Sequence, residues 1–435
     1  MLGVATEHAA IRPRFAEHPL RSFALNEIHA RPFPVMATPR LVLHYAFMTD
    51  AVGAARSRED LARRCDLMKV EGPVGENANH HVVESGGVRL RWETHSEFTT
   101  YTWDLERPLD DGPLPDFFGE GFQAPGPLMV ALRIDLVEDT RPTELILQSL
   151  APASTAVSAL RDGRAIGATD FQVGDGRMTR ILLIDRGLYP QEVGPLVQRV
   201  VELETYRTLA LLGLPEARRL QPEVSRIEAG LRSCTDRIGH APSLSANRQL
   251  LEDLTQLAAE LEASSAASAF RFGASRAYYE IVTMRLTALR EGTLDGYTRW
   301  SSFLERRLAP AMRTCQTLEN RQADLSRRLE RAANLLRTRI DVELEQQNRQ
   351  LLSSMNRRAR LQLRLQQWVE GLSVAAVSYY VIGLINYIAK GVYDSGVNIN
   401  PELVTAIAVV PVVLGIWMFV RFIRARHSHD PDEHA

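Results

Sequence analysis

Cysteine is scarce in this chain, and its three residues are Cys65, Cys234 and Cys315. They lie too far apart along the sequence for the paired spacing of a cysteine-ligated metal site. Their small number also fits a reducing compartment, where disulfides are rare. We therefore expect no metal centre built on cysteine and no disulfide framework.

Motifs that would indicate catalysis are also missing. No nucleophile elbow, glycine-rich phosphate loop or metal signature occurs in the sequence. We therefore expect a protein that is not an enzyme and that carries no cofactor. The net charge of −2 argues against a nucleic-acid partner, because such proteins are usually basic.

Two long apolar stretches lie near the carboxyl end, Gly371–Ala389 and Leu403–Val420, and neither contains a charged residue. Each approaches the roughly 20 residues that a helix needs to cross a bilayer. They predict a transmembrane hairpin, so the lipid bilayer is an expected partner. The alternative is a pair of buried helices in a soluble core.

Arginines flank both outer ends of this hairpin, at Arg357, Arg358, Arg360 and Arg364 before it and at Arg421, Arg424 and Arg426 after it. Basic flanks stay on the cytoplasmic side. The first 15 residues have no long apolar core, so we expect no signal peptide. Both termini are therefore expected in the cytoplasm.

The first part of the chain is rich in β-forming runs, at Leu41–Met48, Val88–Trp103, Leu128–Leu136 and Met178–Ile184. Gly86-Gly87 indicates a hairpin turn. Ser57–Val70 has a helical pattern, with Ser57 as a candidate N-cap. These signals predict an α+β domain.

Beyond this domain the pattern is helical. A helix is expected from Pro190 or Pro195, and Gly194-Pro195 favours the later start. Further helices are expected after Pro215, over Asn247–Ala263 and over Ala274–Arg290. A longer helix is expected from about Tyr297 into the first apolar stretch, disturbed locally at Pro310. Its apolar positions recur at intervals of eleven, which favours a straight or slightly right-handed bundle. Seventy residues of helix would span roughly 105 Å, so we expect a stalk.

The sequence thus predicts seven consecutive parts. They are a cytoplasmic α+β domain (1–188), a helical domain (189–296), a stalk helix (297–370), a first transmembrane helix (371–389), a short periplasmic loop (390–402), a second transmembrane helix (403–421) and a cytoplasmic tail (422–435).

Two short strips combine acidic and imidazole side chains. In an extended chain Glu27, His29 and Arg31 point to one face, and Arg31 precedes Pro32, which disfavours helix. This face has the chemistry to bind a carboxylate, a phosphate or a metal ion. The alternative is a buried polar network that fastens the segment to the sheet.

The second strip is Glu93, His95 and Glu97, which would share one side of a strand. Two carboxylates beside an imidazole suit a divalent ion or acid–base chemistry. A structural role is the alternative, and the sequence leaves the three open.

A polar stripe lies in the first apolar stretch. Tyr379, Gly383, Asn386 and Lys390 share one face of a helix and are candidates for lining a pore. Helix–helix packing is the alternative, because small and polar residues also join membrane helices. Lys390 would repel cations.

Three stretches together carry a family resemblance: His18–Phe33, Glu93–Trp103 and Gly371–Gly391. The chain resembles the bacterial membrane-anchored proteins of domain-of-unknown-function family 3422. The resemblance implies a location in the bacterial inner membrane and supplies no mechanism.

A looser similarity of architecture links the chain to the CorA-type magnesium channels. Those channels carry a Gly-Met-Asn signature after the first span, where this chain has Ala389-Lys390-Gly391. Two functions follow as alternatives. One is an oligomeric CorA-like ion channel with a cytoplasmic regulatory domain. The other is a membrane-tethered module that binds a ligand or protein and transports nothing.

Overall fold

The structure is a computed structural model of the whole chain. It describes residues 18–21, 25, 34–75, 78–107, 109, 114, 116–140, 142, 143, 147, 148, 150, 151, 153–174, 176–240, 243–396 and 399–427. Two compact units divide the chain, one formed by Met1–His240 with Glu252–Ala333 and the other by Ala241–Leu251 with Asn334–Ala435.

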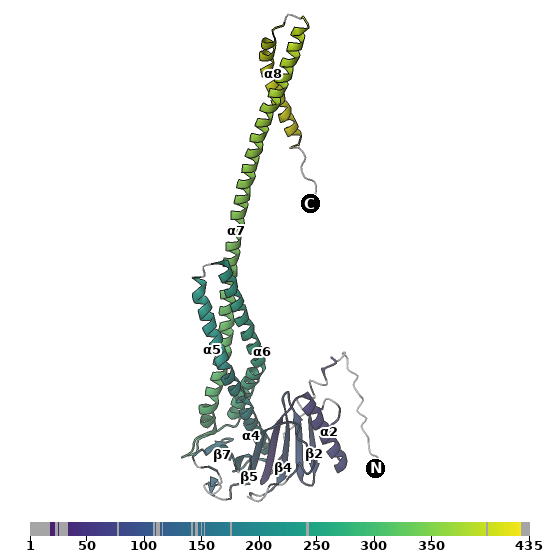
Figure 1. Cartoon of the computed structure of the whole chain (residues 1–435). Helices are drawn as coiled ribbons and strands as arrows, with labels where there is room; N and C mark the ends of the chain where they lie inside the picture. The colour runs from purple at the N-terminus through teal and green to yellow at the C-terminus, as the bar shows by residue number, and fades with distance from the viewer. Residues whose placement is uncertain are drawn as a thin grey trace. The chain divides into compact units, whose positions relative to one another are not determined.

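The first unit contains an eight-stranded mixed sheet (Figure 1). In spatial order the strands are β2 (His80–Ser85), β3 (Val88–Thr94), β4 (Phe98–Glu106), β1 (Arg40–Met48), β5 (Leu128–Glu138), β8 (Thr179–Asp185), β7 (Ala165–Val173) and β6 (Ala156–Leu160). Only the β5–β8 pair is parallel among these neighbours. The expected α+β domain is confirmed.

The hairpin expected at Gly86-Gly87 joins β2 to β3, and both glycines have positive φ angles, 59° and 79°. A two-residue turn with this geometry matches the twist of the strands it joins. The run Val88–Trp103 is β-rich as expected, and it forms β3 and the first part of β4. Residues 95–97 make the turn between β3 and β4, closed by a 2.8 Å bond from His95 N–H to Phe98 O.

The two faces of the sheet are covered by different helices. The helix α2 (Ala51–Met68) lies on one face, and α4 (Pro190–Ala210) crosses the other (Figure 1). Strand β4 contributes to both, because its side chains alternate. Thr100 and Thr102 point to the α4 side, whereas Tyr101 and Trp103 belong to the core under α2. One strand therefore presents a polar face to one layer and an aromatic face to the other.

Helix α2 begins six residues earlier than Ser57. Its N-cap is Asp50, whose carboxylate accepts a 2.7 Å hydrogen bond from Gly53 N–H. An aspartate in this position satisfies an amide that has no partner in the helix. Helix α4 begins at Pro190 and not at the favoured Pro195, and the Tyr189 N–H donates to Glu192 before its first turn.

Three further helices complete the first unit: α5 (Gly213–Ile238), α6 (Leu244–Ala288) and α7 (Trp300–Asp394), of which α6 and α7 continue into the second unit. The two helices expected over Asn247–Ala263 and Ala274–Arg290 are a single one. Ion pairs join these helices, Arg226 to Glu260 and Arg321 to Glu228.

Trp300, the first residue of α7, is fully buried against the sheet. Its indole N–H donates to Ala156 O at 3.1 Å, and its backbone N–H donates to Ser158 Oγ at 2.9 Å. Gly167 on β7 leaves the room for the indole, since a Cβ there would lie 2.7 Å from the Trp300 ring. Pro310 lies inside α7 without ending it, and the local disturbance expected there stays a prediction.

In the second unit α7 runs on to Asp394, and α8 spans Pro401–His427. Both helices are long and apolar enough to cross a membrane. None of the most apolar stretch of α8 and only 11% of that of α7 is buried. Helices of a soluble core would be mostly buried, so this exposure counts against the soluble-core alternative.

The two helices meet along a hairpin seam. Its less exposed positions recur every three or four residues, as expected for packed helices. They are Val374, Ser378, Ile382, Ile385 and Ala389 on α7, and Val404, Ala408, Val412, Ile416 and Val420 on α8.

Candidate functional site

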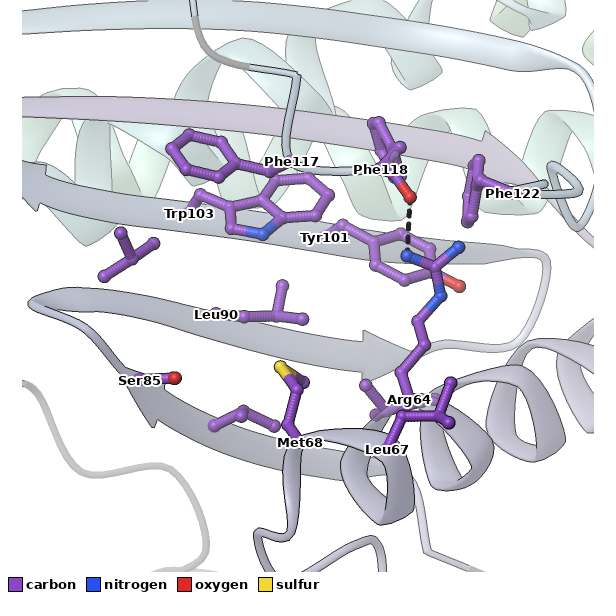
Figure 2. A pocket seen from close by; sticks show the side chains of 13 residues that line it. Arg64, Leu67, Met68, Ser85, Leu90, Tyr101, Trp103, Phe117, Phe118 and Phe122 are labelled. Atoms are coloured by element: carbon purple, nitrogen blue, oxygen red, sulfur yellow. Dashed lines mark hydrogen bonds between the residues drawn. The ribbon is translucent and has the colours of Figure 1, made fainter. Parts of the chain in front are cut away.

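An aromatic pocket lies between α2 and the sheet, with a cavity volume of about 410 Å³ (Figure 2). Its lining comes from α2, from strands β2, β3 and β4, and from the segment 117–122. The residues are Leu61, Arg64, Leu67, Met68, Val83, Ser85, Val88, Leu90, Tyr101, Trp103, Phe117, Phe118 and Phe122.

The aromatic rings form one connected cluster on the wall of this pocket. Trp103 stacks on Tyr101 with ring centroids 5.8 Å apart, and Phe118 meets Trp103 edge-to-face at 4.4 Å. Phe118 and Phe122 lie 4.1 Å apart. Rings that hold one another in this way keep a rigid apolar wall, which a flat or branched apolar molecule can contact without reordering it.

Arg64 closes one side of the pocket. Its guanidinium donates to Phe118 O at 2.6 Å and to Asp60 at 2.8 Å, and it lies 5.2 Å from the centre of the Phe122 ring (Figure 2). These contacts fasten the segment 117–122 to α2. Leu67 and Met68 at the mouth are 84% and 45% exposed, so the pocket opens to solvent along an apolar rim.

A second, polar chamber lies on the opposite face of the sheet, between β1, β3, β4 and α4, with a volume of about 140 Å³. His44 lies at its base, and the imidazole bridges two elements. Its Nδ1 is 2.8 Å from Thr102 Oγ1, and its Nε2 is 3.0 Å from Thr205 Oγ1.

The hydrogen-bond pattern assigns the tautomer of His44. The Thr205 hydroxyl donates its single proton to Val201 O at 2.8 Å. It therefore accepts the hydrogen bond from the ring, so the Nε2 atom of His44 carries the proton. Burial, together with the charges of Arg91 and His95, lowers the pKa of His44 to about 3. The imidazole is therefore neutral at physiological pH.

Two polar atoms on the chamber walls, Thr100 Oγ1 and Gln198 Oε1, have no hydrogen-bond partner among the described residues, and Arg91 Nε has an ion pair with Glu93 Oε2 at 3.5 Å in place of a hydrogen bond. Thr100 is only 3% exposed. Buried polar atoms are normally paired, so the chamber has room and partners for water or a small polar molecule.

The predicted strip at Glu93, His95 and Glu97 is split by the fold, so the expected common face of one strand is wrong. Glu93 on β3 and His95 in the turn line the polar chamber. Glu97 points elsewhere, because the turn reverses the chain. Its carboxylate accepts two bonds from Arg271, at 2.6 and 3.1 Å, and one from Tyr278 at 2.7 Å.

Glu97 therefore has a structural position, joining the β3–β4 turn to α6. Glu27, His29 and Arg31 lie outside the described residues. Within the described parts of the chain, no group of three or more His, Cys, Asp or Glu side chains is arranged to hold a metal ion.

The polar stripe of the first apolar stretch is also divided. Asn386 faces α8, where its Oδ1 lies 3.3 Å from the Thr405 hydroxyl. Tyr379 is 77% exposed and Lys390 is exposed too, so both point away from the seam. Gly383 is half-buried, and a Cβ there would meet nothing within 4 Å.

The aromatic pocket was not foreseen from the sequence, although two signals were available. One is the density of phenylalanine in Phe117–Phe122, and the other is the alternation of Tyr101 and Trp103 on β4. The residues that α2 adds to the pocket could not be predicted in this way. Their approach to β4 depends on how the helix packs on the sheet.

Comparison with curated proteins finds no match for this chain. The family described as "Protein of unknown function (DUF3422)" matches residues 16–427, which is nearly the whole sequence. The chain therefore belongs to the DUF3422 family, as its three motifs led us to expect.

Proposed function

We propose that this protein is a membrane-anchored binding module whose amino-terminal domain takes up an apolar ligand in the aromatic pocket. The observation that carries the proposal is the cavity of about 410 Å³ with a wall of five aromatic rings. Ligand pockets are typically of this size and composition, with few polar groups. No catalytic constellation is part of the proposal.

The anchoring half of the proposal is supported by the hairpin. Apolar side chains cover its outer surface, among them Leu372, Ile407 and Met418, which are 76%, 66% and 64% exposed. So much exposed apolar surface is costly in water and favourable in lipid. With basic residues at both outer ends, the hairpin fits a bacterial inner membrane with both termini in the cytoplasm.

The ligand class follows from the pocket wall. Trp103, Tyr101 and Phe117 have nearly parallel rings, with interplanar angles of 14° and 15° about Trp103. Such a wall favours a flat aromatic molecule or a branched hydrocarbon chain. Arg64 already donates to Asp60 and to Phe118 O. We therefore do not expect the ligand to carry an anionic group that binds Arg64.

The test uses the full chain in lipid nanodiscs and a set of fluorinated, water-soluble aromatic fragments observed by ¹⁹F NMR. We expect line broadening for flat fragments with wild type. Ser85→Trp, which places an indole in the pocket, should abolish it. Val82→Trp on the same strand but outside this pocket is the matched control and should keep it.

Absence of binding by every fragment at millimolar concentration, or equal binding by both variants, would contradict the proposal. If the hairpin only tethers the domain, a chain ending at Arg360 should bind the same fragments. Loss of binding in that shortened chain, with the fold retained by circular dichroism, would tie the pocket to the membrane part.

A second candidate is ion transport by an oligomer of CorA-like architecture. It is favoured by the outward position of Tyr379 and Lys390, which copies of the hairpin would bring to a common path. One hairpin cannot enclose a pore, so a cyclic homo-oligomer is required. The Asn386–Thr405 contact weighs against it, because that side chain is occupied within the hairpin.

Flux measurements in liposomes decide this candidate. Ion flux that changes its selectivity in Lys390→Gln would support transport, and a ring of five subunits in detergent would agree with it. No flux for any monovalent or divalent ion tested, in either direction, would leave only the binding module.

A further inference from the structure

Helix α7 has a strongly basic segment directly before the apolar hairpin. Every residue from Gln346 to Val369 is exposed. The segment contains five arginines, Arg349, Arg357, Arg358, Arg360 and Arg364, and no acidic residue. A single-sign charge over this length attracts a surface of the opposite sign.

Four of these arginines are available for an outside partner. Arg349 pairs with Glu345 at 2.6 Å. For the other four, no acidic side chain lies within ion-pair distance in the described parts of the chain. Their guanidinium groups therefore remain exposed on the helix.

The hairpin defines the level at which lipid headgroups would lie. Starting from the contact between Asn386 and Thr405, Arg421 lies 16 residues along α8, or about 24 Å at 1.5 Å per residue. Counting back 16 residues along α7 reaches Glu370, close to Trp368, which is 80% exposed. At this level α8 carries Arg421 close to Trp417, whereas α7 carries Trp368 and Glu370, with its nearest basic residue, Arg364, about 6 Å beyond Trp368.

On α8 the pairing is direct, since the Arg421 guanidinium lies 5.1 Å from the Trp417 ring centre. On α7, Arg364 lies about 6 Å and Arg360 about 12 Å from Trp368 along the axis, whereas Arg357 lies about 16 Å away. The Debye length at physiological ionic strength is about 8 Å. Arg364 is therefore within one Debye length of the headgroup level, Arg360 lies about one and a half Debye lengths from it and Arg357 about two, so the attraction to headgroups weakens in that order.

We infer that Arg360 and Arg364, with Arg421, form a headgroup site that binds the phosphates of anionic phospholipids. The inference rests on the proposed membrane anchoring and goes beyond it, because anchoring alone requires no preference among lipids. Guanidinium groups bind phosphate through paired hydrogen bonds, which makes arginine suited to this task. A second copy of the segment is a poor occupant, because five arginines without an acid would repel their equivalents.

The test measures lipid preference with the full chain in vesicles of phosphatidylcholine with phosphatidylglycerol. Brominated forms of each lipid quench tryptophan at the interface, where Trp368 and Trp417 lie, and the ratio of quenching gives the relative binding constant. About 1 kcal/mol per basic residue at an anionic surface corresponds to roughly fivefold each.

We expect wild type to prefer phosphatidylglycerol, and Arg360→Gln with Arg364→Gln to reduce that preference by roughly threefold after screening, with about 25-fold as the unscreened limit. Arg357→Gln with Arg358→Gln is the matched control at the same charge change and should reduce it by less than about twofold. Added salt should weaken the wild-type preference.

Equal quenching by both lipids in wild type, or equal effects of the two double variants, would overturn the inference. So would displacement of the lipid by millimolar glycerol phosphate, which would indicate a site for free phosphate.

Quenching that is independent of lipid, together with cross-linking between copies at Leu361→Cys, would assign the segment to self-association instead. Alkaline carbonate treatment separates the two proposals: a chain released from vesicles contradicts the anchoring itself.

Discussion

Thr205 Oγ1 lies 3.0 Å from His44 Nε2, although 161 residues separate the two along the chain. This contact joins α4 to the middle of the sheet and fixes a neutral imidazole in the core. It also makes His44 a source of pH-dependent stability.

The pKa of His44 is lowered from 6.5 to about 3 by burial. The unfolded chain takes up a proton below pH 6.5, whereas the folded chain does so only near pH 3. Between these values the unfolded state binds more protons, so the free energy of unfolding falls as the pH is lowered. The difference corresponds to about 5 kcal/mol at the acid end.

The measurement is thermal unfolding of the full chain in detergent, from pH 7 to pH 4. His44→Gln should be less stable at pH 7 and should show a shallower loss with acidification than wild type. His240→Gln, at an exposed position, is the control and should follow the wild-type curve. Parallel curves for His44→Gln and wild type would contradict this account.

The Glu97 carboxylate and its partners predict a second stability effect. Glu97 is 8% exposed and binds both Arg271 and Tyr278, so Glu97→Gln leaves a guanidinium without its counter-charge. Removing one member of such a pair costs about 3–5 kcal/mol when buried, and somewhat less here because Arg271 is partly exposed. We expect a loss of about 2–4 kcal/mol.

Arg276→Gln is the matched control for Glu97→Gln. Its pair with Glu319 is exposed and should be worth no more than about 1 kcal/mol. A double-mutant cycle of Glu97→Gln with Tyr278→Phe should show coupling. Additive effects of the two changes would indicate that the hydrogen bond between them contributes nothing to stability.

Gly167 predicts a packing effect at the start of α7. A Cβ at this position would lie 2.6 Å from Leu160 and 2.7 Å from Trp300, whose ring is fully buried. Gly167→Ala should lower the unfolding free energy by about 1–3 kcal/mol through overpacking. Gly176→Ala, where a Cβ would meet nothing within 4 Å, should leave it within about 0.5 kcal/mol. The reverse order of the two effects would contradict the packing described here.

The hairpin contact between Asn386 and Thr405 predicts a modest contribution. Hydrogen bonds between membrane helices average about 0.6 kcal/mol, with values up to about 1.7. Asn386→Leu and Thr405→Val should each lower the unfolding free energy of the hairpin by about this amount, and the double variant should lower it little further. The measurement is unfolding by titration with sodium dodecyl sulfate. Strictly additive losses would show that the two side chains act separately.

The cysteines give the last prediction. All three are buried, and burial raises the pKa of each thiol, so the reactive thiolate is rare. We expect no labelling of the native chain by a thiol reagent at pH 7.5, and three labels per chain after unfolding. Rapid labelling of a native cysteine would show that the surrounding helices open readily.

Some of these features could be read from local patterns. The pair Gly86-Gly87, whose φ angles are positive, predicted the β2–β3 hairpin, and the uncharged apolar runs predicted α8 and the end of α7. Strands β6 and β7 left no comparable signal, because both are rich in small residues. The number of helices after Pro190 was overestimated by one, since α6 continues as a helix through Gly273.

The sequence by itself determined the α+β class of the first domain, the membrane-compatible hairpin and the family, because each depends on local periodicity, on composition or on short motifs. The tertiary structure decided which side chains meet. It separated Glu97 from Glu93 by a turn, placed Asn386 against α8, and assembled the aromatic pocket from α2, three strands and the segment 117–122. Such contacts depend on how distant segments pack, which no pattern along the chain specifies.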